Sequence, residues 1–246
     1  MRIYFLLLGC LVACLSSAAA DANVVLGGTR LIYPEGDREV TLSLANKGAT
    51  PALVQSWMDD GHGDSTPENS AAPFLIMPPV TRIEAQASQT LRILFNGASL
   101  PQDHESLFWL NVLEIPPTSA DARGKNNLLL AIQSRIKVFY RPRALAGSLH
   151  EAAQQLKWKM VKNGDRWQLV CTNSSPFHVS FATLVVAHSG NVLSDDSGAH
   201  MVAPGGRETF ELKRASATAS APKEGEVQFD YINDYGALKT LTATVE

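Results

Sequence analysis

Lys137 is the residue whose surroundings most clearly suggest chemistry, because it interrupts an apolar run that reads as a β-strand. An unpaired charge in such a strand is costly. Its ammonium group must therefore point to solvent, meet an acid or await a ligand. Arg30, taken alone, reads as an ordinary solvated surface charge.

The other reactive groups show no pattern of a catalytic or metal site. None of the six histidines stands at metal-ligand spacing with another, and Cys171 has no neighbouring ligand. His62-Gly63-Asp64 fits a solvated loop better than an ion site. No G-x-S-x-G or phosphate-binding loop appears, although a triad assembled from distant residues would not be visible in the sequence. We therefore expect no enzyme, no metal and no cofactor.

The N-terminus predicts export. A positive residue precedes an apolar run over residues 3–15, and alanines at 18–20 supply a cleavage site. We expect residues 1–20 to be a cleaved signal peptide. No later segment has the ~20 apolar residues that a membrane span needs, so we expect no membrane insertion. A second interpretation stays open, in which Leu11-Val12-Ala13-Cys14 is a lipoprotein signal and Cys14 carries lipid.

Composition points to cores rather than disulfides. Without residues 1–20, Cys171 is the only cysteine left, so the mature chain can form no internal disulfide. Because Leu169 and Val170 beside it are apolar, we expect Cys171 to be a buried strand residue. The formal net charge of −3 gives no reason to expect a nucleic-acid partner. About 225 residues supply two domains of ordinary size.

Short apolar runs with Gly, Asn and Pro between them indicate an all-β protein. Apolar and polar residues alternate over residues 40–44 and 91–95. Short runs that read as strands follow one another again from residue 158 to residue 245. Only residues 150–156 read as a helix. The sequence Arg141-Pro142-Arg143 follows a strand and contains proline, so we place the boundary there. This divides the mature chain into two immunoglobulin-like β-sandwich domains, residues 21–141 and 142–246.

The most informative segment is residues 127–140, which contain no Gly or Pro and exceed the five or six residues of a typical strand. Leu128, Leu130 and Ile132 form an apolar row at period two. The last strand of such a sandwich commonly lies at a sheet edge, where a long apolar strand is an aggregation hazard. Proteins that keep such an edge use it, for instance by adding a strand to a partner. The alternative is a strand buried on both faces by the two sheets.

Several motifs carry a resemblance to a known family. They are G-T-R-L-I-Y-P at 28–34, P-P-V at 78–80, E-S-L-F-W-L-N at 105–111 with E-I-P-P at 114–117, Q-S-R-I-K-V-F-Y-R-P at 133–142, N-S-S-P-F at 173–177 and Y-I-N-D-Y-G at 231–236. Together they resemble the periplasmic chaperones of the chaperone–usher pilus pathway. The resemblance covers essentially the whole mature chain and is strongest over residues 105–142.

The resemblance implies a periplasmic, ATP-independent assembly chaperone whose two sandwiches are set at an angle with a ligand cleft between them. Such a chaperone stabilises pilus (fimbrial) subunits by donor-strand complementation and delivers them to an outer-membrane usher. Some relatives carry a disulfide near the C-terminus, which this chain cannot form.

The resemblance also implies roles for single residues. Arg30 and Lys137 resemble two cations that face the cleft and bind the C-terminal carboxylate of the subunit. The implied donor-strand residues, which enter the open groove of the subunit, are Leu128, Leu130 and Ile132. The implied ion pairs between the domains involve Glu105, Arg141 and Asp234.

Two rival functions remain. An exported immunoglobulin-like binding or adhesin module would show a recognition loop rich in aromatic residues, and the loops here are poor in them. An exported hydrolase is the third class. The sequence leaves open which pilus is served and whether the free form associates with itself through its exposed edge.

Overall fold

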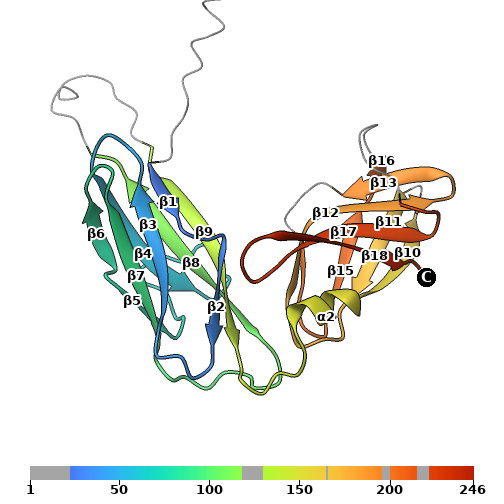
Figure 1. Ribbon diagram of the computed structural model, residues 1–246, viewed down its shortest axis with the longest axis horizontal. Coiled ribbons are helices and arrows are strands. Elements are labelled where there is room, and N and C mark those ends of the chain that lie inside the picture. Colours follow the sequence, from blue (N-terminus) through green and yellow to red (C-terminus); the bar gives the residue numbers. More distant parts are fainter. Residues whose placement is uncertain (1–22, 118–129, 165, 196–199, 215–221) are drawn as a thin grey trace, which may run out of the picture.

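The computed structural model describes residues 23–117, 130–164, 166–195, 200–214 and 222–246. Within these ranges the regular structure is almost entirely β, and two β-sandwich domains meet at an angle (Figure 1). The predicted all-β fold of two immunoglobulin-like domains is confirmed. No helix in the described ranges is long and apolar enough to cross a membrane. The predicted signal peptide, residues 1–20, lies outside the described residues.

Domain one packs a four-stranded sheet, in the order β1-β3-β7-β5, on a five-stranded sheet, in the order β2-β9-β8-β4-β6. All pairs are antiparallel except β2 with β9, which are parallel. The strands are β1 Val24–Leu26, β2 Arg30–Pro34, β3 Val40–Asn46, β4 Ala52–Asp59, β5 Phe74–Met77, β6 Val80–Ile83, β7 Ser88–Phe95, β8 Ser106–Ile115 and β9 Ile132–Arg141.

Alternation along the strands builds the core of domain one. Leu42 and Leu44 of β3 are buried, while the intervening Thr41 and Ser43 are exposed. Period-two patterning turns the apolar side chains of both sheets toward each other. The core therefore lies between the two sheets.

Domain two begins with α2 (Leu149–Gln154), whose first turn is capped by Ser148 accepting a hydrogen bond from the Glu151 amide. A three-stranded sheet has the order β10-β11-β15, and a six-stranded sheet has the order β16-β13-β12-β17-β18 with β14 paired to β12. The strands are β10 Lys157–Asn163, β11 Arg166–Thr172, β12 Val179–His188, β13 Asn191–Asp195, β14 Met201–Val202, β15 Arg207–Glu211, β16 Lys213–Arg214, β17 Glu226–Ile232 and β18 Leu238–Thr244.

Aromatic rings fill the core of domain two. Trp158 lies 5.6 Å from Phe181, 5.8 Å from Phe210 and 5.0 Å from Phe229, measured between ring centroids. Cys171 of β11 is fully buried, and burial raises the pKa of its thiol. The prediction that Cys171 is a buried strand residue is confirmed.

The predicted long strand is shorter in the described residues than the sequence indicated. β9 begins at Ile132, Leu130 and Ala131 precede it outside the strand, and residues 127–129 lie outside the described ranges. The last pair between β9 and β8 is Ile132 with Glu114. Beyond it the neighbouring chain reaches Pro116 and Pro117, which have no amide hydrogen to donate, so pairing cannot continue on that side.

Candidate functional site

The first half of β9 is an open strand edge. β9 pairs with β8 from Ile132 to Tyr140, but β2 pairs only with the second half, from Lys137 to Arg141. Among the described residues, no strand pairs with the other side of residues 132–136. Leu130 is 67% exposed and Ile132 is 42% exposed at this edge. Neither belongs to the core, and Leu128 lies outside the described residues.

The structure brings Arg30 and Lys137 together. They are direct partners in the parallel pairing of β2 with β9, so their side chains lie next to each other on one face of the sheet. The Lys137 Nζ donates to the Ser180 Oγ of β12 at 3.2 Å, and the Arg30 Nη1 donates to the Ile232 carbonyl of β17 at 3.0 Å. Both acceptors belong to domain two, which places the two cations where the domains meet.

These two cations are poorly solvated. Arg30 is only 7% exposed, more enclosed than the expected open cleft would make it, and its Nε has no hydrogen-bond partner among the described residues. Burial and, secondly, the charge of Arg30 lower the pKa of Lys137 to about 8. Burial also lowers the pKa of Arg30, against the opposing charges of Asp234 and Glu105. Two like charges held together with an unused donor make a site suited to an anion.

Glu105, Arg141 and Asp234 also come together. The Arg141 Nε donates to the Glu105 Oε1 at 2.7 Å, and its Nη1 and Nη2 donate to the two Asp234 carboxylate oxygens at 2.7 and 2.8 Å. Burial alone would lower the pKa of Arg141, but the two carboxylates raise it. Arg141 ends β9 in domain one, whereas Asp234 lies in the hairpin between β17 and β18 in domain two. The trio therefore spans the domain junction.

His178 belongs to the same network, although nothing in the sequence distinguished it from the other histidines. Its backbone amide donates to the Glu105 Oε2 at 2.8 Å, and its Nδ1 lies 3.3 Å from the same oxygen. The side chain of Glu105 is 1% exposed. One buried carboxylate of domain one thus binds groups from both domains.

The hairpin between β17 and β18 reaches from domain two toward domain one (Figure 1). Asn233 Oδ1 shapes its turn by accepting from the backbone amides of Tyr235 and Ala237. At Gly236, φ is +82° and a Cβ atom would lie 2.7 Å from the Thr29 Oγ1 of domain one. Glycine is therefore needed there for both the turn and the close approach.

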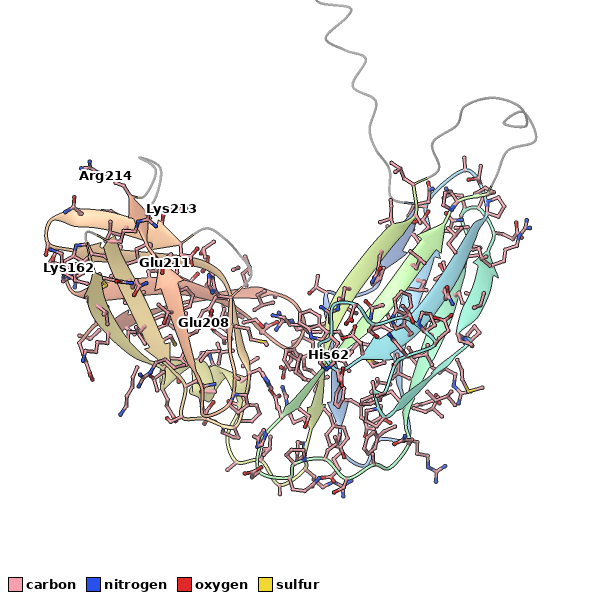
Figure 2. All side chains as sticks on the ribbon, turned by 180° about the vertical axis from the view of Figure 1, so that it is seen from behind. His62, Lys162, Glu208, Glu211, Lys213 and Arg214 are labelled. Atoms are coloured by element: carbon pink, nitrogen blue, oxygen red, sulfur yellow. The ribbon has the colours of Figure 1, made fainter. Side chains whose placement is uncertain are left out.

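His62 lies near the domain junction but is largely exposed, whereas the charged end of domain two lies apart from these contacts (Figure 2). The side chain of His62 is 78% exposed and its Nε2 is 3.8 Å from the Asp60 Oδ1. Lys162, Glu211, Lys213 and Arg214 lie at the end of domain two that is farthest from domain one (Figure 2). In the part of the chain that the structure describes, no group of three His, Cys, Asp or Glu side chains is placed to hold a metal ion.

Both domains match families of pilus-assembly chaperones. Residues 23–146 match the family described as pili and flagellar-assembly chaperone, PapD N-terminal domain, and residues 151–243 match pili assembly chaperone PapD, C-terminal domain. Chaperone protein FimB/FhaD of Bordetella pertussis is 38% identical over 231 residues, 92% of this chain and 90% of that protein. Chaperone protein MrkB of Klebsiella pneumoniae is 40% identical over 235 residues, 94% and 95% of the two chains.

A solved structure shows the same similarity in three dimensions. A chain in the structure of the Salmonella enterica SafA pilin in complex with the SafB chaperone has a TM-score of 0.73 and 30% identity to this chain. The match covers 92% of this chain and 98% of that one.

Proposed function

Because this chain belongs to the family of PapD-like pili assembly chaperones, we propose that it stabilises pilus subunits in the periplasm by lending them the open edge of β9. Leu130 and Ile132 enter a groove that the subunit leaves open. We assign the same role to Leu128 because of its match to the family. An exposed apolar groove is an aggregation hazard, and an added strand covers both its backbone and its side chains.

Arg30 and Lys137 bind the C-terminal carboxylate of the subunit. A carboxylate accepts several hydrogen bonds, and it would give the unpartnered Arg30 Nε an acceptor while offsetting the repulsion between the two cations. The cations lie at the β2-paired half of β9, immediately after its open half. A subunit anchored there by its terminus can run its last strand back along residues 132–136.

The remaining steps follow the pathway of the family. Residues 1–20 direct export and are removed, the mature chain holds the subunit without ATP, and an outer-membrane usher then receives the subunit. No metal, cofactor or catalytic residue takes part in this scheme.

The observation that carries the proposal is the unpaired half of β9, with Leu130 and Ile132 exposed beside the Arg30–Lys137 pair. We expect the mature protein, coexpressed with a pilus subunit of its own system, to elute from a sizing column as a one-to-one complex. The subunit expressed alone should aggregate. A subunit that stays soluble alone and elutes separately would contradict the proposal. Binding to cell surfaces without a subunit would favour the adhesin instead.

The Glu105–Arg141–Asp234 network sets the angle between the domains. Arg141→Ala should broaden the distribution of shapes in small-angle scattering while each domain stays folded, because it removes the cation that joins two acids from different domains. Glu105 would keep the His178 amide but lose its charge partner, which is costly for a buried carboxylate.

Arg214→Ala is the control for this change, since Arg214 is exposed at the far end of domain two (Figure 2). The control should leave the scattering profile unchanged. If Arg141→Ala also left the profile and the melting temperature unchanged, the three charges would not orient the domains.

A further inference from the structure

A second polar cluster lies on the outer face of the five-stranded sheet, across β4, β8 and β9. Asp59 ends β4, and its side chain is only 2% exposed. Its Oδ1 and Oδ2 accept from the Arg135 Nη2 at 2.5 Å and Nε at 3.1 Å, which is a two-point carboxylate–guanidinium contact. The Asn111 Nδ2 and the Gly61 amide donate to the same carboxylate at 2.6 and 2.7 Å.

The cluster reaches both ends of the open half of β9. The Gln133 Nε2 donates to the Asn111 Oδ1 at 2.9 Å, so both outward-facing residues of this half, Gln133 and Arg135, are tied to neighbouring strands. The guanidinium of Arg135 lies over the Trp109 ring at 4.3 Å, and the Lys137 Nζ is 5.6 Å from the same ring. Trp109 thus connects the cluster to the anchor lysine.

The carboxylate at the centre is held in its charged form. Burial alone would raise the pKa of Asp59, but the hydrogen bonds from Arg135, Asn111 and Gly61 lower it below its ordinary value. The pair is therefore ionised at neutral pH.

The inner face of the open half offers little to hold the strand. Ile136 is buried, but Ser134 is half-buried and Ile132 is exposed. This half of β9 therefore has one paired edge and one buried position, whereas residues 137–140 are paired on both sides and largely buried. Backbone pairing with β8 and side-chain contacts on the outer face must supply most of what holds residues 132–136 to the sheet.

We infer that the Asp59–Arg135 pair is a clasp that holds residues 132–136 extended against β8 before a subunit arrives. Arg135 is thereby a positioning residue, which presents Leu130 and Ile132 at a constant spacing from Lys137. A strand ordered in advance costs less conformational entropy when it binds, so the clasp acts mainly on the association rate. The inference rests on the proposed function, because the clasp matters only if β9 is the donated strand.

Arg135→Gln tests the clasp, with Arg82→Gln as a matched control. Arg82 lies on β6 at the far edge of the same sheet and pairs with Glu84, and both side chains are 64% exposed. Hydrogen exchange of the free protein should become faster over residues 130–136 and over the β8 residues paired with them in Arg135→Gln, while residues 40–46 of β3, in the other sheet, keep their wild-type rates. The subunit, diluted from denaturant into chaperone, should associate about tenfold more slowly, equivalent to ~1.4 kcal/mol. Its dissociation rate should change less than twofold.

Several outcomes separate this inference from its alternatives. If Arg135→Gln keeps the wild-type rates of hydrogen exchange and of association with the subunit, the clasp is overturned. If exchange becomes faster over all of domain one, the pair only stabilises the domain as a whole, and the clasp is likewise overturned. If Arg135→Gln does not fold, Gln133→Ala, which loses one hydrogen bond, must show the same local increase in exchange. Wild-type protein that binds no subunit would overturn the proposed function, while the exchange data would still judge the clasp.

Discussion

Lys137→Ala should weaken subunit binding about ten- to a hundredfold without unfolding domain one. The change removes one charge-assisted hydrogen bond to the subunit's terminal carboxylate, worth ~1.5–3 kcal/mol. The fold should survive, because the lysine contributes one described hydrogen bond, to Ser180, and its buried charge is itself unfavourable. Titration of the chaperone with subunit, beside a melting curve of each variant, measures both effects.

Arg30→Ala should lose as much affinity but also melt slightly lower, since Arg30 donates to the Ile232 carbonyl across the domain junction. Lys213→Ala is the control, because Lys213 is exposed at the end of domain two away from domain one (Figure 2). It should bind as the wild type does. If both Lys137→Ala and Arg30→Ala bound the subunit with wild-type affinity, the two cations would not bind its C-terminal carboxylate.

The pH dependence of subunit binding should reflect the titration of Lys137. The pKa of Lys137 is lowered to about 8 in the free protein, first by burial and then by Arg30. Below pH 8 the ammonium is charged and ready for a carboxylate; above pH 8 the protein must take up a proton to bind. Affinity should therefore fall as the pH rises above about 8, and Lys137→Ala should lose this part of the dependence.

Patterning explains why the strands of the core could be predicted. Leu42 and Leu44 alternate with polar residues, as a strand half-buried by one facing sheet requires. β4 was not predicted, because its last four residues are all buried and break the alternation. One of these is Asp59, whose buried charge is balanced by Arg135, 76 residues later, and which accepts further hydrogen bonds from Asn111 and Gly61.

Some residues of the site could likewise be predicted from the sequence pattern, and others could not. The exposed apolar row at the start of β9 and just before it is visible in the sequence, since Leu130 and Ile132 are spaced as in a strand and have no charged residue beside them. The roles of Arg30 and Lys137 came from resemblance, because only the parallel register of β2 with β9 places them together. The Asp59–Arg135 pair depends on register across three strands, which no single-sequence pattern contains.

Leu130→Asp should abolish the complex and leave the free protein folded. Leu130 is 67% exposed, so an aspartate there disturbs no core contact in domain one. In the subunit groove, however, the same carboxylate would be desolvated without a partner, at a cost of several kcal/mol. The free variant should be at least as soluble as the wild type, because a charge guards the exposed edge. Melting and subunit pull-down of the purified variant measure the two halves of this prediction.

The most direct test of the donated strand is this pair of measurements on three variants together. Leu75→Asp, at 56% exposure on β5, should both fold and bind, whereas Val138→Asp, fully buried in β9 itself, should unfold domain one. The account predicts that Leu130→Asp melts like Leu75→Asp and yet retains no subunit. If Leu130→Asp instead unfolds like Val138→Asp, or folds and still binds the subunit, then Leu130 is not donated and the mechanism proposed for β9 is wrong.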